Sequence, residues 1–412
     1  MISKLLINSN KYSVWILASI IVIRLYLVTL PSFRIDMNSW LAWSARLVEV
    51  TPLHFYAPNY FADYLPGYLY ILWFIGKSFQ ILFSPLSIFS NQFEIYLKFI
   101  TNLFDFGTAY FIYKIVARYN RKWANWSSLL YLGNPALTFN SSVMGQVDGV
   151  PTFFLIYAIY LLLESKKATL WGIVMAIAGL IKPQVLVVLP IMLLALFKQF
   201  SIKQVLTSII IFISLPFILS SPFFLNDPIF GLIKLLQKSV EVYPFNSIFA
   251  YNFWGLFGWW QSDINTLFHL TYRNWGVILF GFTLILIFIP LTYKKYSSKP
   301  SIIYMAFALS AMDFFLFLTR IHERYLFPVF ALFLIAVSIK KTASLIWTYI
   351  LLSFIHLINL WQVYFYYNYV YNDPAKASIQ PYAFISQSSL IFTMITLIIF
   401  VIILRRHLES RE

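Results

Sequence analysis

The sequence predicts an all-α polytopic membrane protein, with about twelve transmembrane helices and at least one further helix embedded in an outer loop. Of the 412 residues, 60% are hydrophobic and only 11% are charged, and the mean hydropathy is +0.76. Such a chain carries more apolar surface than one soluble core can bury. Its long apolar runs are separated by short clusters of Lys and Arg, as in proteins that cross a bilayer repeatedly.

The charge and the rare residue types exclude several function classes. The formal net charge of +15 could indicate a nucleic-acid partner in a soluble protein. Here the basic residues lie in loops between apolar runs, so we expect a lipid bilayer as the partner and no nucleic acid. The chain has no cysteine, which excludes disulfides, thiolate nucleophiles and Cys-ligated zinc. Its five histidines are too scattered to form a metal site.

The first apolar run extends from Tyr12 to Leu30 and is long enough to span a membrane. Lys4 and Lys11 precede it, and no small-x-small cleavage site follows it. We therefore expect a retained signal anchor whose N-terminus lies in the cytoplasm. Asp36, about five residues beyond this run, then faces outward.

Clusters of Lys and Arg mark the expected cytoplasmic turns. They lie at 114–122, 166–167, 198–203, 294–299, 340–341 and 405–406. An even number of crossings must separate each cluster from the next, and the apolar runs satisfy this rule. The remaining spans are expected at about 98–117, 125–142, 150–164, 168–182, 183–197, 204–221, 275–293, 301–319, 325–339, 343–361 and 386–404. We treat 1–412 as one membrane domain with large outer loops at about 32–97 and 222–274.

One apolar run, at about 67–83, does not fit this alternation. Only one crossing is permitted between Asp36 outside and the cluster at 114–122 inside, and the run at 98–117 supplies it. The extra run begins Asp63-Tyr64-Leu65-Pro66-Gly67 and is rich in aromatic residues. These features favour a helix that lies at the membrane interface or enters it partly.

The polar residues that are rare in this chain gather at the expected outer turns. The inner loops, by contrast, contain little besides Lys, Arg, Ser and Asn. This asymmetry predicts a functional site on the outer face. Its candidate segments are Asp36, Asp63-Tyr64, Gly145-Gln146-Val147-Asp148-Gly149, Lys182-Pro183-Gln184 and His322-Glu323-Arg324-Tyr325.

A carboxylate beside a membrane surface, with cations at the same depth, suits a reaction in which a hydroxyl loses a proton while an anionic group leaves. Structural roles remain open for several candidates. Asp63 can cap the embedded helix, and Gln146 and Asp148 can belong to a simple turn between helices. Trp40 and Trp43 can stack on a sugar or serve as interfacial anchors.

Three charged residues fall within the expected spans: Arg24, Asp105 and Asp313. An unpaired charge is costly in lipid, so each requires a partner or an aqueous cavity. We expect Arg24 to snorkel outward, and Asp105 and Asp313 to brace the helix bundle through buried pairs. A proton relay is the alternative role for the two aspartates.

The order of these motifs resembles that of the membrane-embedded glycosyltransferases of the GT-C fold, and most closely the prokaryotic relatives of GPI mannosyltransferase II. The resemblance spans nearly the whole chain. It rests on Asp36, Asp63-Tyr64-Leu65-Pro66-Gly67-Tyr68, Asp105, Gly145-Gln146-Val147-Asp148, Lys182-Pro183-Gln184 and His322-Glu323-Arg324-Tyr325-Leu326.

This resemblance implies the transfer, with inversion, of a hexose, preferably mannose, from a polyprenyl-phosphate donor. The acceptor is a hydroxyl of a glycan, glycolipid or protein on the outer face of a prokaryotic cytoplasmic membrane. The catalytic carboxylate maps onto Asp36, and the donor phosphate onto His322, Arg324 and Lys182. The substrate-binding set maps onto Asp63, Tyr64, Gln146, Asp148, Gln184, Glu323 and Tyr325.

Asp36 is followed by Met37-Asn38 and not by a second acidic residue. An acidic pair for a metal is therefore missing. The resemblance also implies a metal-independent reaction, and we expect neither a metal nor another cofactor. The alternative function is a polytopic lipid or sugar transporter or flippase. Such proteins usually show repeated halves and broken helices at the midplane, which are not evident here.

Overall fold

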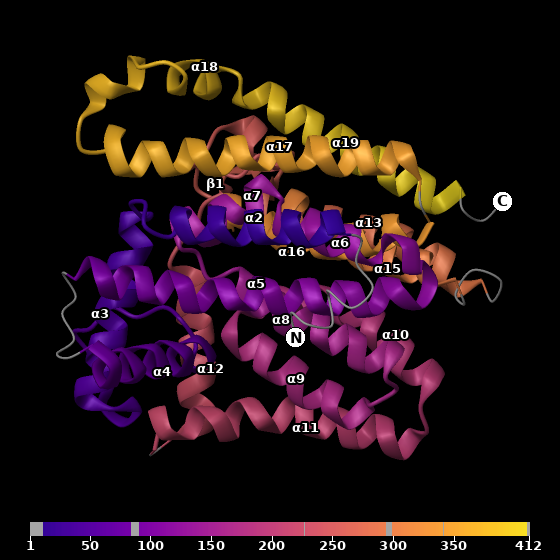
Figure 1. The fold of residues 1–412 in the computed structure, drawn as a ribbon, viewed down its shortest axis with the longest axis horizontal. Coiled ribbons are helices and arrows are strands. Elements are labelled where there is room, and N and C mark those ends of the chain that lie inside the picture. The colour runs from indigo at the N-terminus through magenta and orange to yellow at the C-terminus, as the bar shows by residue number, and fades with distance from the viewer. Residues whose placement is uncertain (1–10, 84–89, 226, 294–298, 341, 410–412) are drawn as a thin grey trace. The chain divides into compact units, whose positions relative to one another are not determined.

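The computed structural model describes residues 11–83, 90–225, 227–293, 299–340 and 342–409. These residues form 17 α-helices and four strands of two residues each. Lys4, Lys341 and most of the cationic cluster at 294–299 lie outside the described residues. The helices follow the expected apolar runs, which confirms a largely α-helical chain of membrane character (Figure 1).

Five of the described helices are long and apolar enough to cross a membrane. They are Ile202–Phe223, Tyr272–Thr292, Pro300–Phe317, Ala343–Val370 and Ser389–Glu409. Further apolar helices are shorter, at Tyr12–Leu27, Gly149–Glu164, Ala168–Ile181 and Pro183–Gln199. The expected number of about twelve crossings therefore stays a prediction.

The chain groups into two compact units. Unit 1 comprises Met1–Val22, Ala109–Asn140 and Tyr243–Glu412, and unit 2 comprises Ile23–Thr108 and Ser141–Val242. Helices α2 (Lys11–Leu27) and α5 (Asn91–Tyr119) contribute residues to both.

Unit 2 contains a series of helices of which each runs antiparallel to the one before: α8 (Gly149–Ile159), α9 (Ala168–Ile181), α10 (Leu189–Gln199) and α11 (Ile202–Ser220). Their boundaries follow from the sequence. Pro183 ends α9 and opens a 3₁₀ turn before α10, and Ser201 and Gln204 form a capping box that starts α11. The side chains of Lys166 and Gln199 form a hydrogen bond, so the two cationic turns of this unit lie at the same end of its helices.

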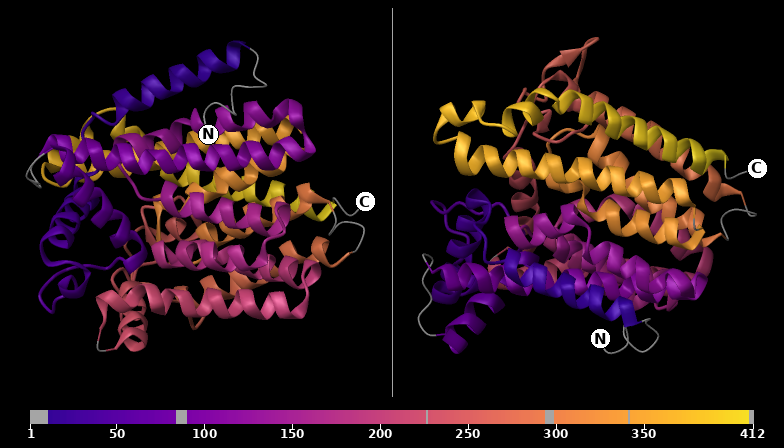
Figure 2. Two further views of the ribbon diagram at one scale, coloured as in Figure 1. Left: turned by 60° about the horizontal axis from the view of Figure 1, so that its bottom comes forward. Right: turned by 45° about the horizontal axis from the view of Figure 1, so that its top comes forward.

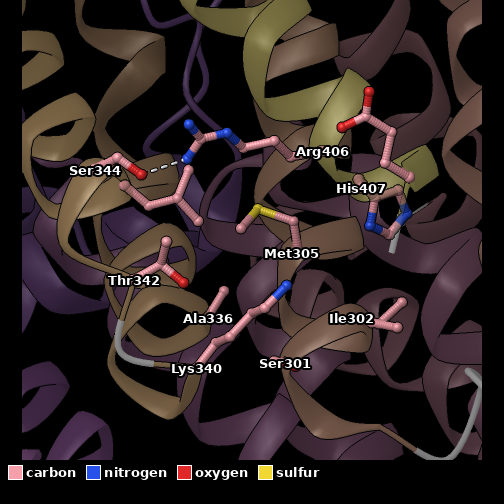
Figure 3. A pocket seen from close by; sticks show the side chains of 11 residues that line it. Ser301, Ile302, Met305, Ala336, Lys340, Thr342, Ser344, Arg406 and His407 are labelled. Atoms are coloured by element: carbon pink, nitrogen blue, oxygen red, sulfur yellow. Dashed lines mark hydrogen bonds between the residues drawn. The ribbon is translucent and has the colours of Figure 1, made fainter. Parts of the chain in front are cut away.

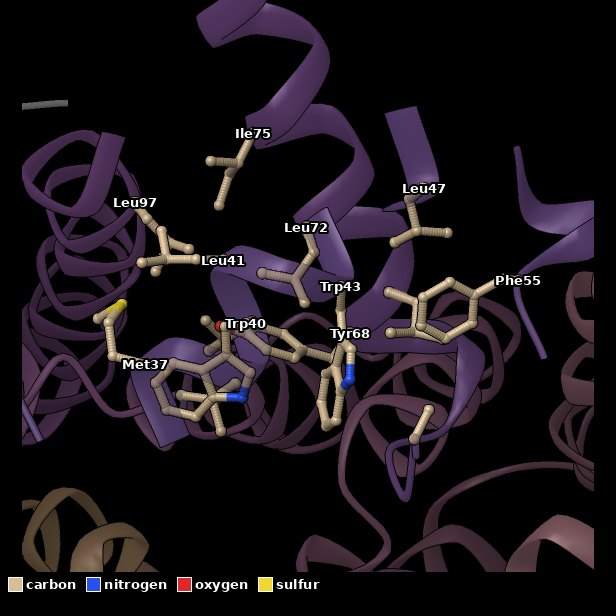
Figure 4. Packing of buried hydrophobic residues seen from close by; sticks show 14 of the residues in the cluster. Met37, Trp40, Leu41, Trp43, Leu47, Phe55, Tyr68, Leu72, Ile75 and Leu97 are labelled. Atoms are coloured by element: carbon tan, nitrogen blue, oxygen red, sulfur yellow. The ribbon is translucent and has the colours of Figure 1, made fainter. Parts of the chain in front are cut away.

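The core of unit 2 lies between α3 (Arg34–Val50) and α4 (Pro66–Phe83) (Figure 4). The two helices approach closely because Gly76 faces Ser44, whose hydroxyl donates to the Leu72 carbonyl at 2.7 Å. Trp40 and Trp43 are 1% and 3% exposed in this core. Both therefore pack inside the protein, which corrects the expectation that they stack on a sugar or anchor the interface.

A further amphipathic helix, α12 (Pro228–Glu241), lies within the expected outer loop at 222–274. Asp227 caps its first turn, and Pro228 occupies the first helical position. Leu232 and Leu235 of α12 pack against Leu65 and Leu180. The second expected outer loop therefore contributes a packed helix to unit 2.

Unit 1 contains α6 (Arg121–Leu132), α7 (Pro135–Thr138), α13 (Tyr272–Thr292), α15 (Pro300–Phe317), α16 (Phe327–Lys340), α17 (Ala343–Phe365), α18 (Tyr382–Gln387) and α19 (Ser389–Glu409). Helix α16 is buried on nearly all sides from Phe327 to Ser338. Helices α17 and α19 lie side by side, and the segment with α18 connects them (Figures 1 and 2).

Four short strands, which the sequence did not predict, fasten the loops of unit 1. Strand β1 (Ser247–Ile248) pairs in parallel with β4 (Ile321–His322), and β2 (Thr266–Leu267) pairs with β3 (Leu270–Thr271). The β1–β4 pair ties the loop after Tyr243 to the turn between α15 and α16. The strand pairing thus fixes the backbone of Ile321 and His322, directly before Glu323.

The three charged residues expected within the spans each have a polar partner inside the protein. Arg24 is 3% exposed, and its guanidinium contacts the Asp105 carboxylate at 2.7 Å and the Asn102 side chain at 2.9 Å. Asp105 therefore braces the bundle as expected, whereas the expected snorkelling of Arg24 is wrong because its charge is satisfied internally. Asp313 accepts a hydrogen bond from the Thr283 hydroxyl.

Candidate functional site

Asp36 lies in the first turn of α3, three residues after Phe33. The backbone N–H groups of a first helical turn have no partner within the helix, and the helix dipole favours an anion there. The backbone N–H of Phe33 donates to the Met144 carbonyl at 3.1 Å. This bond joins the start of α3 to the segment that carries Gln146.

The Gln146 side chain holds the Asp36 carboxylate. Its amide nitrogen donates to Asp36 Oδ2 at 3.0 Å, and Gln146 itself is 1% exposed. The preceding residue, Gly145, has a φ of +73°, and a Cβ there would lie 2.5 Å from Met37 Cε. Only glycine therefore combines this backbone conformation with the close approach that brings Gln146 to α3.

Asp148 and Lys182 form a buried ion pair beside these residues. Lys182 Nζ lies 2.5 Å from Asp148 Oδ1, and the two residues are 6% and 2% exposed. Lys182 follows the last residue of α9, where the break at Pro183 leaves it with an extended backbone. Asp148 precedes α8 but makes no side-chain capping bond. Its carboxylate is oriented by Lys182 instead.

The Tyr68 phenol, on α4, is fully buried near both carboxylates. Burial, followed by the negative charges of Asp148 and Asp36, raises the pKa of this phenol well above its ordinary value. The ring packs against those of Trp40 and Tyr64, with centroids 5.9 Å and 5.5 Å away. Tyr68 therefore stays protonated and can only act as a neutral hydroxyl near neutral pH.

The two carboxylates of this site differ in access. Asp148 is closed off and neutralised by Lys182, whereas Asp36 is only half-buried and is held by a neutral amide. A group that takes a proton from a substrate needs contact with that substrate. Asp36 meets this requirement better than Asp148.

The other candidates of unit 2 lie around this site. Tyr64 is half-buried, with its ring centroid 5.5 Å from that of Trp43. The Asp63 carbonyl accepts a hydrogen bond from the Ser239 hydroxyl at 2.7 Å, which joins this segment to α12. Gln184 is half-buried in the turn after Lys182, and its side-chain oxygen has no hydrogen-bond partner among the described residues.

The His322-Glu323-Arg324-Tyr325 cluster belongs to unit 1. Arg324 Nη1 lies 3.3 Å from His322 Nδ1 and 3.4 Å from Glu323 Oε1. The three residues are buried, and Tyr243 packs edge-on against the His322 ring at 5.1 Å. His322, Glu323 and Arg324 thus contact one another, and their role in binding stays a prediction. The sequence did not reveal Tyr243 as their neighbour.

Sequence reasoning also missed the ion pair between Asp263 and Arg320 of unit 1. Arg320 Nε lies 2.6 Å from Asp263 Oδ2, and Asp263 is fully buried. Arg320 has a φ of +65°, directly before the β4 strand that leads into His322. The scarcity of acidic residues was the available signal for Asp263. We interpret the pair as support for the turn that carries the cluster.

Among the residues that the structure describes, no group of three or more His, Asp or Glu side chains is arranged to hold a metal ion. No protein-family model matches the chain, and no curated protein matches it.

Proposed function

We propose that this protein is a membrane glycosyltransferase of the GT-C type, which transfers a hexose from a polyprenyl-phosphate donor to an acceptor hydroxyl with inversion. The observation that carries this proposal is the Asp36 carboxylate, half-buried and oriented by the Gln146 amide beside the Tyr68 phenol. The order of the sequence motifs adds mannose as the preferred sugar. The proposed reaction takes place on the outer face of the membrane.

In the proposed reaction, Asp36 accepts the proton of the acceptor hydroxyl as the hydroxyl oxygen attacks the anomeric carbon. A bond forms between that oxygen and the anomeric carbon, and the bond from the carbon to the donor phosphate breaks. The electron pair leaves with the polyprenyl phosphate. Attack from the face opposite the leaving group inverts the anomeric configuration.

The neighbouring side chains support this chemistry in distinct ways. Gln146 is a positioning residue, because it fixes the orientation of Asp36. The Asp148–Lys182 ion pair holds the ends of α8 and α9 beside the site. The order of the sequence motifs adds contact with the donor phosphate for Lys182, His322 and Arg324. Positive charge, as on Lys182 and Arg324, stabilises a departing phosphate.

The decisive experiment measures sugar transfer by the purified chain from radiolabelled polyprenyl-phosphate mannose to a mixed acceptor extract. Asp36→Asn keeps the shape of the side chain but cannot accept a proton at neutral pH. We expect it to lower turnover by about 10² to 10⁴-fold, the usual contribution of a general base. The matched control is Glu49→Gln, which removes an exposed carboxylate from the other end of α3.

Full turnover by a folded Asp36→Asn protein would exclude this mechanism. Donor binding, measured separately, distinguishes a lost chemical step from a lost binding site. A parallel series with polyprenyl-phosphate glucose tests the sugar. If labelled lipid crosses proteoliposome membranes without any transfer of sugar, the protein is a transporter and the proposal is wrong.

A further inference from the structure

A basic pocket of about 380 Å³ lies at one end of the unit 1 helices (Figure 3). It is formed where α15 and α17 begin and α16 and α19 end. Its lining residues are Ser301, Ile302, Met305, Ala336, Lys340, Thr342, Ser344, Leu345, Arg406, His407 and Glu409.

This pocket is distinct from the His322 cluster. Helix α15 begins at the pocket and leads toward Ile321, and α16 returns from Phe327 to Lys340. With a rise of about 1.5 Å per residue, the two sites lie roughly 25 Å apart along these helices. A role for the pocket is therefore independent of the proposed sugar transfer.

The pocket has a positive character. The Lys340 side chain extends toward its centre, and the Arg406 guanidinium is held at its wall by a 2.6 Å hydrogen bond to the Ser344 hydroxyl (Figure 3). The one acidic lining residue, Glu409, is paired with Arg405 at 2.5 Å. Lys340 and Arg406 thus present two cationic groups to any molecule that enters.

Hydroxyl and apolar groups complete the lining. Ser301, Thr342 and Ser344 supply hydroxyls, while Ile302 and Met305 supply an apolar wall. A phosphate diester attached to hydrocarbon matches this combination, because phosphate oxygens accept bonds from Arg, Lys and hydroxyls. A free sugar would leave the apolar wall without a partner.

The position of the pocket favours a lipid as the source of the phosphate. Helices α15, α17 and α19 are among those that could cross a membrane, and the pocket lies at their ends. Trp347, one turn from Ser344, is 70% exposed, as is typical of a side chain at headgroup depth. On α19, Ile398, Val401 and Ile402 form an exposed apolar surface that leads up to Arg406.

We propose that the basic pocket binds the phosphate of an anionic phospholipid headgroup between Lys340 and Arg406. Basic pockets between transmembrane helices are known to recognise such headgroups. The acyl chains extend from the pocket along the apolar surface of α19. The protein thereby carries a lipid site in addition to any substrate site.

Native mass spectrometry of the full chain in neutral detergent tests this site, with short-chain phosphatidylglycerol or phosphatidylcholine added in a concentration series. We expect the wild-type protein to prefer phosphatidylglycerol. Each basic residue near a membrane surface contributes about fivefold in affinity, so the Lys340→Gln/Arg406→Gln double variant should bind phosphatidylglycerol about 30-fold more weakly. The control, Lys203→Gln, removes an exposed charge from unit 2 and should bind as the wild type does.

An additional arm with inorganic phosphate distinguishes the two sources of phosphate. The proposal predicts that millimolar phosphate does not displace phosphatidylglycerol, because it lacks the acyl chains. Displacement would reassign the pocket to free phosphate, and equal retention of the two lipids, or unchanged binding by the double variant, would also overturn the proposal. If the double variant fails to fold, the wild-type comparison of the two lipids decides alone.

Discussion

The Gln146 side chain donates a hydrogen bond to the Asp36 carboxylate at 3.0 Å, across 110 residues of sequence. It joins the first turn of α3 to the glycine-rich turn before α8. The side-chain oxygen of Gln146 has no hydrogen-bond partner among the described residues. The bond from the side-chain nitrogen to Asp36 therefore accounts for the orientation of the Gln146 side chain. The turn at Gly145 thus places Gln146 where its side chain orients Asp36.

Replacing Gln146 by alanine should lower kcat by about 10 to 100-fold, because a misplaced catalytic group loses much of its effect. KM for the donor should change less than kcat, since the Gln146 amide nitrogen donates its hydrogen bond to Asp36. Sugar-transfer kinetics measure both parameters. The control is Gln80→Ala on the exposed face of α4, and a loss confined to KM would contradict the positioning role.

The Tyr68 phenol should make the folded state sensitive to alkali. Because burial raises its pKa, the phenol ionises in the unfolded chain at lower pH than in the folded protein. Ionisation of this phenol in the unfolded chain does not affect stability below its ordinary pKa of 10.0. As the pH rises above 10.0, this ionisation favours the unfolded chain and so destabilises the folded protein. The expected slope is about 1.4 kcal/mol per pH unit for this one group.

Tyr68→Phe should therefore make the decline of the unfolding midpoint above pH 10 shallower than in the wild type. Below that pH the variant should be as stable as the wild type or slightly more so, since it removes a buried hydroxyl. Thermal unfolding in detergent between neutral and alkaline pH measures both effects. Identical alkaline slopes for the two proteins would refute this account.

Removing one partner of the Asp148–Lys182 ion pair should destabilise the folded protein more than replacing both partners by neutral side chains. Lys182→Met leaves the Asp148 charge buried without its partner and should destabilise the protein by about 3 to 5 kcal/mol. The Asp148→Asn/Lys182→Met double variant should recover much of this loss. Unfolding in mixed detergent micelles, followed by circular dichroism, gives the values, with Lys203→Met as the exposed control.

A loss in Lys182→Met that the second substitution does not restore would show that Lys182 stabilises the protein through other contacts. Restored stability without restored activity would instead support a role for Lys182 in donor binding. The two measurements therefore separate packing from function at this residue.

Gly67, at the start of α4, should tolerate no side chain. A Cβ there would lie 2.5 Å from the carbonyl carbon of Leu180 and 2.6 Å from the amide nitrogen of Ile181. Backbone atoms cannot move aside cheaply, so Gly67→Ala should cost about 1 to 3 kcal/mol. At Gly281 of α13 nothing lies within 4 Å, and Gly281→Ala should be neutral or stabilising. Equal unfolding midpoints for these two variants would contradict the close approach of α4 and α9.

Much of the fold could be predicted because its signals are local. Long apolar runs give the helices, and Pro183 marks the break after α9. The cationic clusters also predicted which helix ends lie together within a unit. Lys166 meets Gln199 in unit 2, and Asn120 donates to the Ser338 carbonyl, near Lys340, in unit 1.

The partners within the candidate site could not be predicted, because they depend on tertiary contacts. Lys182 was expected to bind a phosphate, and nothing near it in sequence indicated its pair with Asp148. Arg24 was expected to snorkel, and its true partner, Asp105, could not be found from the sequence because it lies 81 residues away. The short β1–β4 pairing was missed for the same reason: two residues per strand leave no periodic pattern to detect.

The division of the chain between the two units has a consequence for its biosynthesis. Unit 2 ends at Val242, whereas unit 1 needs the segment from Tyr243 to Glu412. During translation, the Asp36–Gln146 contact can therefore form while α15 to α19 are still unmade. The early residues of unit 1, including α6, by contrast meet most of their partners only after the segment from Tyr243 onward has been synthesised.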